Sequence, residues 1–158
     1  MINAQIEKKQ IPVIYRKIAP TYDAWAWLTE RKARERCLEL AAIRDGEDVL
    51  EVAVGTGLAF EKILAANPSG NNEGIDLTAE MLQRAEKRAA RTGSDNYRLR
   101  VGDAYDLDFP NDSFDVLLNN YMFDLLPEQD FLTVLDEFKR VLRLSLIHIS
   151  EPTRRATI

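Results

Sequence analysis

The sequence predicts an α/β fold in which helices cover both faces of a doubly wound parallel sheet. Strand patterns alternate with helical patterns along the 158 residues, and the connections between them are short. The first strand pattern is almost continuously apolar, which is typical of a strand buried on both faces of a parallel sheet. With 46% hydrophobic and 30% charged residues, the chain has the composition of one globular domain.

The first half of the chain contains two helical patterns and two strand patterns. Thr29 is suited to cap the first helix, and Gly46 supplies a C-terminal stop after it. A Gly-Thr-Gly sequence breaks the first strand before the second helix begins. The expected order is an N-terminal segment over 11–28, a helix over 29–43, a strand over 48–54, a helix over 58–66, a turn over 67–72 and a strand over 73–76.

The second half continues the alternation. Thr78 is suited to cap the third helix, and Met81 and Ala85 lie on its inner face. Pro127 suits the first turn of the last helix, because a helix makes no use of an N–H there. The expected order is a helix beginning after 78, a turn over 93–96, strands over 97–101 and 113–119, and a helix from about 127 to 142.

The end of the chain resembles a sequence of different origin. Residues 144–154, LSLIHISEPTR, match the translation of a transposase-type sequencing-library adapter at every position. We therefore expect 144–158 to be a non-native read-through tail and 1–143 to be a partial domain. The alternative is that 144–149 form a genuine strand. Without the tail the sheet has about four strands, and the fourth would be an unpaired apolar edge prone to aggregation.

Composition and charge limit the possible functions. The net charge of −5, with acidic and basic residues interleaved, argues against a nucleic-acid partner. Arg88 belongs to a small basic cluster whose helical spacing indicates a solvated face. No segment is apolar and long enough to cross a membrane, and the N-terminus is no secretory signal. The single cysteine fits a reducing cytoplasm. The sequence predicts no metal site.

A glycine pair follows the first predicted strand. In an open parallel sheet, ligands bind beyond the carboxyl ends of the strands. Gly55 and Gly57 would let the backbone turn tightly and approach a ligand. The dinucleotide fingerprint requires a third glycine where this chain has Phe60, so a ligand without a diphosphate is favoured.

Three acidic residues lie within or at the end of successive strands. Glu51 either reaches water at a strand edge, or holds the glycine loop or a ligand ammonium group, because a buried carboxylate needs a partner. Asp76 either accepts both ribose hydroxyls of a nucleoside or caps the following helix. Asp103 either accepts from an adenine amino group or is an ordinary turn residue.

Four segments together resemble the motifs of class I S-adenosylmethionine-dependent methyltransferases. They are, in order, 49–57, 74–76, 102–104 and 114–118, and the resemblance covers about 12–143. Residues 15–23 resemble the N-terminal segment of the small-molecule branch, which includes the ubiquinone and menaquinone C-methyltransferases. The resemblance implies a Rossmann-like sheet of seven strands, S-adenosylmethionine as cofactor and a small-molecule methyl acceptor.

The resemblance also implies roles for individual residues. The methionine part of the cofactor would lie on the glycine loop above Glu51, the ribose on Asp76, and the adenine beside Leu77 and Met81. Ala53 stands where the family often has glycine. The implied cofactor-binding residues are Tyr22, Glu51, Ala53, Gly55, Thr56, Gly57, Asp76, Leu77, Met81, Asp103, Ala104 and Asn119.

The acceptor is less well defined by the sequence. Residues 119–122, NNYM, do not match the Asn/Asp-Pro-Pro-aromatic signature of amino-group methyltransferases, so a carbon or oxygen acceptor is favoured. Asp23, Tyr121 and Asp124 lie near the expected acceptor side, and no catalytic base is assigned. As a fragment, the chain is expected to be poorly soluble and inactive. The alternatives are a non-catalytic nucleoside-binding domain and a nicotinamide-dependent oxidoreductase.

Overall fold

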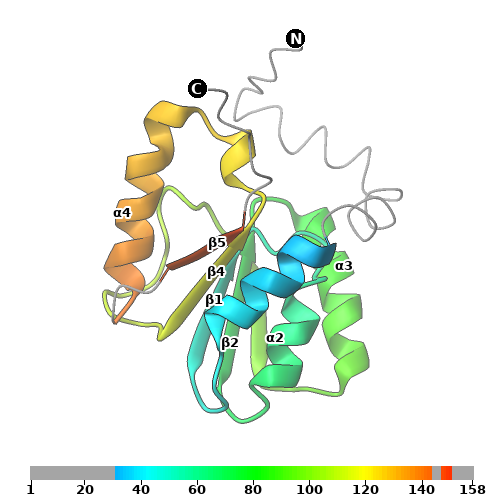
Figure 1. Ribbon diagram of the computed structural model, residues 1–158. Helices are drawn as coiled ribbons and strands as arrows, with labels where there is room; N and C mark the ends of the chain where they lie inside the picture. Colours follow the sequence, from blue (N-terminus) through cyan, green and yellow to red (C-terminus); the bar gives the residue numbers. More distant parts are fainter. Residues whose placement is uncertain (1–30, 144–146, 151–158) are drawn as a thin grey trace.

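The computed structural model describes residues 31–143 and 147–150 and contains one parallel sheet (Figure 1). The sheet has five strands in the order β3-β2-β1-β4-β5. From β1 the chain builds outward through β2 to β3, then crosses back to place β4 on the other side of β1. This reversal of strand order creates a switch point between β1 and β4. The strands are β1 (Asp48–Val52), β2 (Asn71–Asp76), β3 (Tyr97–Val101), β4 (Val116–Asn120) and β5 (Ile147–Ser150).

Helices cover both faces of the sheet, as the strand-helix alternation predicts. Figure 1 shows α4 on one face, and α2, α3 and the helical segment 31–41 on the other. No helix in the described part of the chain is long and apolar enough to span a membrane. The labelled helices are α2 (Phe60–Ala66), α3 (Ala79–Ala89) and α4 (Phe131–Val141), with short 3-10 turns η1 (Ala90–Thr92), η2 (Phe123–Leu125) and η3 (Glu128–Asp130).

Two hydrophobic cores lie on opposite faces of the central strand. Leu50 and Val52 of β1 pack in the core that contains Phe138 of α4. Val49 points to the other side, into the core that contains Ile63 of α2 and Ala85 of α3. Successive strand residues point to opposite faces, so an apolar run is required where both faces are covered. The predicted fold class is therefore confirmed.

The fifth strand corrects one expectation. The sequence predicts about four strands and an unpaired edge at β4, but β5 pairs in parallel with β4, with Leu117 opposite Ile147. The outer strands are thus β3 and β5. β5 lies inside the segment expected to be a non-native tail. The non-native origin of that tail stays a prediction, but β4 is not an open edge in this structure.

A buried asparagine network holds the opposite, amino-terminal end of the sheet. The Asn67 side chain is fully buried, accepts from the backbone N–H of Gly46 at 2.8 Å, and donates to Asn72 Oδ1 at 2.9 Å. Asn96 donates to the carbonyl oxygens of Asn67 and Gly70. These contacts extend β2 back to Asn71, two residues earlier than predicted. The turn is therefore a structural anchor far from the carboxyl ends of the strands.

Candidate functional site

A cavity of about 250 Å³ opens at the carboxyl ends of β1 to β4. Gly55 follows β1, Asp76 ends β2, Asp103 follows β3 and Asn120 ends β4, and all four line the cavity. A further wall comes from the chain after β4, through Leu126 and neighbouring residues. The cavity thus lies where the doubly wound topology predicts a ligand.

The loop after β1 has a left-handed backbone at alternate positions. Ala53 has φ 61°, Gly55 φ 57° and Gly57 φ 84°. Ala53 and Gly55 line the cavity, and nothing lies within 4 Å of the position a Cβ would take on Gly55. Gly57 is not among the described residues that line the cavity. It faces α3 instead, where a Cβ on Gly57 would come within 2.9 Å of the Ala85 Cα. Gly55 therefore leaves space for a ligand, and Gly57 lets α3 pack closely.

The Asp76 carboxylate joins the glycine loop to the start of α3. Its Oδ2 accepts from the Gly55 backbone N–H at 2.8 Å, and its Oδ1 accepts from the Thr78 backbone N–H and hydroxyl, each at 2.9 Å. Burial raises the pKa of this carboxyl, and the hydrogen bonds from Thr78 and Gly55 act against that rise. Asp76 thus lines the cavity, while Thr78 is the N-cap residue of α3 that it supports from two positions earlier. Its role as a ribose acceptor stays a prediction.

Glu51 is buried in the middle of the sheet and does not line the cavity. Its residual exposure of 2% excludes the interpretation that it reaches water. Burial raises its pKa to about 8, the Asn120 amide and the Arg34 guanidinium oppose the rise, and nearby Asp76 adds to it. Among the described residues, Glu51 Oε2 has no hydrogen-bond partner. The protonated form is therefore favoured below about pH 8.

Of the two asparagines that end β4, the cavity is lined by Asn120. Asn119 is fully buried, donates from Nδ2 to the Val52 carbonyl at 2.9 Å, and does not line the cavity. The sequence interpretation placed Asn119 at the ligand; the structure gives that position to its neighbour. Thr56 likewise is buried away from the lining, and its carbonyl accepts from Arg88 Nε at 3.0 Å.

The far side of the cavity brings together the residues expected beside an adenine. Leu77, Met81, Asp103 and Ala104 all line it. The Asp103 Oδ1 accepts from the backbone N–H of Tyr105 at 3.1 Å, so its position is set by the loop that follows β3. Apolar side chains and one carboxylate thus face the same space. Tyr22 lies outside the described residues.

From the segment after β4, the sequence places Tyr121 and Asp124 near the acceptor side; Tyr121 lines the cavity and Asp124 is not among the lining residues described. Sequence reasoning missed the apolar wall that follows Tyr121. Met122, Leu125, Leu126 and Pro127 line the cavity from this segment, and Tyr105 lines it from the loop after β3. Apolar residues of this kind occur in any loop that packs next to a core, so no local feature of the sequence marks them as cavity residues.

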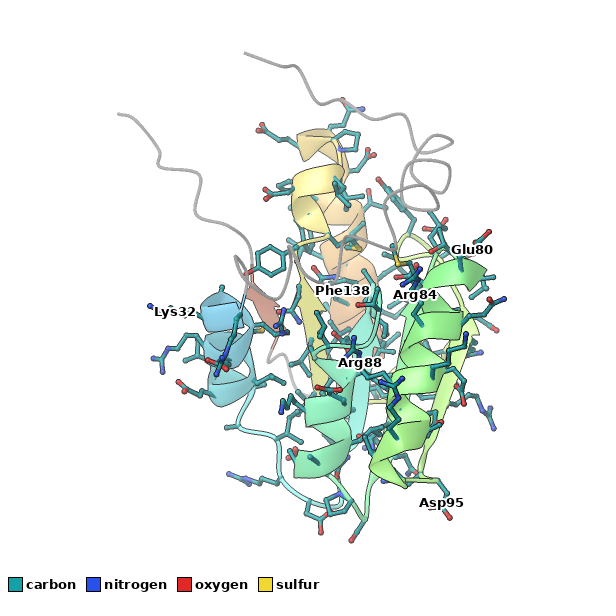
Figure 2. The ribbon with its side chains drawn as sticks, turned by 90° about the vertical axis from the view of Figure 1, so that its right-hand side faces the viewer. Lys32, Glu80, Arg84, Arg88, Asp95 and Phe138 are labelled. Atoms are coloured by element: carbon teal, nitrogen blue, oxygen red, sulfur yellow. The ribbon has the colours of Figure 1, made fainter. Side chains whose placement is uncertain are left out.

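Arg88 also differs from expectation. It reaches from α3 (Figure 2) to the Thr56 carbonyl and lies 3.5 Å from Glu61, with a side chain only 24% exposed. A solvated face therefore does not describe it. Arg88 instead fixes the glycine loop to the two helices that pack behind it.

Comparison with known families decides the identity of this domain. The sequence profile described as a methyltransferase domain matches residues 49–145. The chain belongs to the methyltransferase domain family. S-adenosylmethionine is the cofactor of this family.

Individual relatives agree with this placement. A demethylmenaquinone methyltransferase of Bacillus velezensis is 28% identical over 144 residues, which cover 87% of this chain and 60% of the relative. An arsenite methyltransferase of Halobacterium salinarum is 35% identical over 106 residues, 65% of this chain and 26% of the relative. The chain therefore spans less than two thirds of the length of these relatives. The crystal structure of the YcgJ protein from Bacillus subtilis superposes with a TM-score of 0.64 at 26% identity, covering 72% of this chain and 47% of that protein.

The residues of this methyltransferase domain fit the chemistry of the cofactor. Of the polar side chains at the ends of β1 and β4, Asn120 lines the cavity, and within the described part of the chain the geometry gives its two polar side-chain atoms no hydrogen-bond partner, although its amide lies close enough to Glu51 to lower the pKa of that carboxyl. Buried polar atoms are usually hydrogen-bonded, so a polar group in the cavity would suit Asn120. An amide both donates and accepts, so Asn120 is suited to the carboxylate and ammonium groups of a methionine moiety.

Proposed function

We propose that the protein is a cytoplasmic enzyme that transfers a methyl group from S-adenosylmethionine to a carbon or oxygen atom of a small molecule. The observation that carries this proposal is the convergence of Gly55, Asp76 and Asp103, from the ends of three strands, on one cavity. A glycine that leaves open space and two carboxylates placed apart suit a nucleoside with a charged amino-acid tail.

The ribose would bind at Asp76. A carboxylate has about four acceptor positions; hydrogen bonds from Gly55 and Thr78 use three of them, and the Leu77 backbone N–H also donates to it. A ribose hydroxyl would therefore compete with the donors already present. The Thr78 hydroxyl can rotate away and free an acceptor position, whereas the backbone N–H groups cannot.

The remainder of the cofactor would extend to both sides of Asp76. Asp103 and Ala104 would meet the adenine edge, while Leu77 and Met81 cover its face. Gly55 and Asn120 would hold the methionine end. The residues named for the cofactor thus follow one line across the strand ends.

The catalytic contribution of the protein is alignment and exclusion of water. The bound cofactor supplies an already activated, positively charged methyl donor. Met122, Leu125 and Leu126 form an apolar wall that keeps water from the reacting atoms. Holding donor and acceptor in line replaces a bimolecular encounter and lowers the entropic part of the barrier. A base is required only if the acceptor loses a proton in the same step.

The lining also favours a class of acceptor. Among the described residues no lysine, arginine or histidine lines the cavity, while three aspartates do: Asp76, Asp103 and Asp130. The carboxylates, although assigned to the adenosine end, give the cavity a negative field that disfavours an anionic acceptor, and the apolar wall of Met122, Leu125 and Leu126 favours a neutral apolar molecule such as a quinol ring. Arsenite is disfavoured, because arsenic(III) prefers thiolates and burial raises the pKa of the single cysteine, Cys37, to about 11.

Calorimetry with the purified chain tests the cofactor assignment. S-adenosylhomocysteine is expected to bind, and NAD is not. The Asp76→Asn variant is expected to bind S-adenosylhomocysteine at least about tenfold more weakly, because an amide replaces an anionic acceptor of the ribose hydroxyl. Asp95→Asn, at a site outside the cavity lining, is the control (Figure 2). Binding of NAD in place of S-adenosylhomocysteine would refute the assignment.

A transfer assay then tests the reaction. Tritiated S-adenosylmethionine is incubated with neutral phenols and quinols, with anionic analogues and with amines, and label in the extracted product is counted. Labelling of a neutral carbon or oxygen acceptor supports the proposal. Binding of S-adenosylhomocysteine without label transfer to any acceptor would count against methyl transfer by this chain, and it would agree both with an inactive fragment and with the non-catalytic nucleoside-binding alternative.

A further inference from the structure

A hydrogen bond joins the two walls of the cavity at their outer edge. The Tyr105 hydroxyl donates to Asp130 Oδ2 at 2.8 Å, across 25 positions of sequence. Tyr105 belongs to the loop after β3, and Asp130 ends η3 directly before α4. Both residues line the cavity. Other hydrogen bonds also join these two segments: the Leu107 backbone N–H donates to Glu137 Oε2 at 2.8 Å, and Arg140 donates to the Leu107 and Phe109 carbonyl oxygens at 2.7 Å each. The Tyr105–Asp130 contact differs from them in that both of its partners line the cavity.

The same contact is linked to the cofactor-facing residues. Tyr105 directly follows Asp103 and Ala104, and its backbone N–H donates to Asp103 Oδ1 at 3.1 Å. On the other side, Asp130 follows Leu126 and Pro127, which also line the cavity. Loss of the Tyr105–Asp130 hydrogen bond would therefore loosen the cavity rim between Asp103 and the apolar wall, while the bonds to Glu137 and Arg140 keep the loop attached to α4.

We propose that the Tyr105–Asp130 hydrogen bond is a latch that holds these two walls around the adenosine part of the cofactor and slows its release. The inference rests on the proposed function, because it takes an adenosine as the occupant. A phenol donating to a carboxylate forms one of the stronger hydrogen bonds in proteins. Burial raises the pKa of Tyr105 to about 12, and the hydrogen bond to Asp130 adds to the rise, so the phenol remains a donor at neutral pH. Both groups are positioning residues, since neither needs to contact the reacting atoms.

The latch predicts a kinetic effect that exceeds any effect on folding. Tyr105→Phe keeps the ring and removes the donor, and Asp130→Ala removes the acceptor. Each is expected to raise the dissociation rate of S-adenosylhomocysteine about five- to tenfold, the net size of one typical intramolecular hydrogen bond. The double variant is expected to dissociate no faster than either single one, because both remove the same interaction.

Stopped-flow displacement of S-adenosylhomocysteine measures these rates, with urea unfolding of the unliganded chain as the parallel readout. Asp130→Asn is the matched variant, because its amide oxygen still accepts from Tyr105; its dissociation rate is expected to stay within about threefold of the parent. The free energy of unfolding is expected to change by less than the free energy that corresponds to the change in dissociation rate.

The outcomes separate the latch from the function on which it rests. Equal dissociation rates in the parent and Tyr105→Phe, or additive effects in the double variant, overturn the latch while leaving cofactor binding intact. Absence of S-adenosylhomocysteine binding in the parent overturns the proposed function, and the latch with it. Coupled single-variant effects, with rescue by Asp130→Asn, support the latch.

Discussion

Replacing the buried Glu51 by glutamine is expected to change how the stability of the protein depends on pH. The pKa of Glu51 is about 8 in the folded chain, against the ordinary glutamate value of 4.5, which applies to the unfolded chain. Between these values the folded state binds a proton that the unfolded state has lost. Stability contributed by this proton is complete below pH 4.5 and is lost as pH rises through 8.

The size of the effect follows from the two pKa values. Each pKa unit corresponds to about 1.4 kcal/mol, so ionising Glu51 in place destabilises the fold by about 5 kcal/mol once the pH exceeds 8. Glutamine has nearly the same shape and carries no ionisable proton. Glu51→Gln should therefore match the parent near pH 5 and exceed its unfolding free energy at pH 9 by several kcal/mol.

Urea unfolding at half-unit steps from pH 5 to pH 9 measures this difference. Asp76 also has a raised pKa and titrates in both proteins, so subtracting the two curves removes its own contribution and leaves that of Glu51 together with the coupling between the two carboxyls. Glu39→Gln, at an exposed position of the helical segment 31–41, controls for the loss of one acidic group. Parallel curves for the parent and Glu51→Gln would refute the conclusion that this carboxyl is protonated in the folded state.

Two further predictions concern the loop after β1, and urea unfolding measures both. Ala53→Gly is expected to stabilise the fold by about 0.5–1 kcal/mol, because it relieves a left-handed alanine at φ 61° and this gain exceeds the added flexibility of glycine in the unfolded chain. Gly57→Ala is expected to destabilise it by about 2–4 kcal/mol, because its φ is 84° and the new Cβ would meet the Ala85 backbone at 2.9 Å. If Gly57→Ala changed the free energy of unfolding by no more than Ala53→Gly does, the close packing of Gly57 against α3 would be contradicted.

The fold could be predicted because burial imposes a regular pattern on the sequence. Val49, Leu50 and Val52 are at most 1% exposed, and a strand covered on both faces has no position for a polar side chain unless it serves another purpose. Glu51 stands out against that background for this reason. The residues at the carboxyl ends of the strands could be predicted as site residues for a similar reason, since a parallel topology alone places these ends at one edge of the sheet.

The details of the site depend on contacts between distant residues, which no local pattern encodes. Tyr105 and Asp130 are 25 positions apart, and Asn119 meets the Val52 carbonyl across 67. Whether Asn119 or Asn120 faces the cavity depends on the pleat, so a shift of one residue reverses the answer. The roles of Gly55 and Gly57 differ only because α3 crosses close to one of them.

The pairing of β5 with β4 has a physical cause that is independent of where residues 144–158 originate. Without a neighbour, β4 would present unpaired backbone groups and buried apolar residues such as Leu117 and Leu118 at an edge. A short apolar segment such as IHIS is suited to pair with such an edge. The unpaired backbone groups of β4 therefore favour pairing with any suitable neighbouring segment. The resemblance of the same residues to an adapter sequence bears on their origin and not on this pairing.

Asp76 shows why the latch is a sharper probe of this site than its central carboxylate. Its hydrogen bonds to Gly55 and Thr78 fix the loop and helix that form the cavity, so the ribose acceptor is already oriented before a ligand arrives. Removing it must alter the cavity and the binding together, and affinity alone would not separate the two. Tyr105 and Asp130 contact each other through a single hydroxyl, so deleting that atom leaves the rings, the strands and the Asp76 network in place. A change in cofactor release after that deletion would therefore report on closure of the walls.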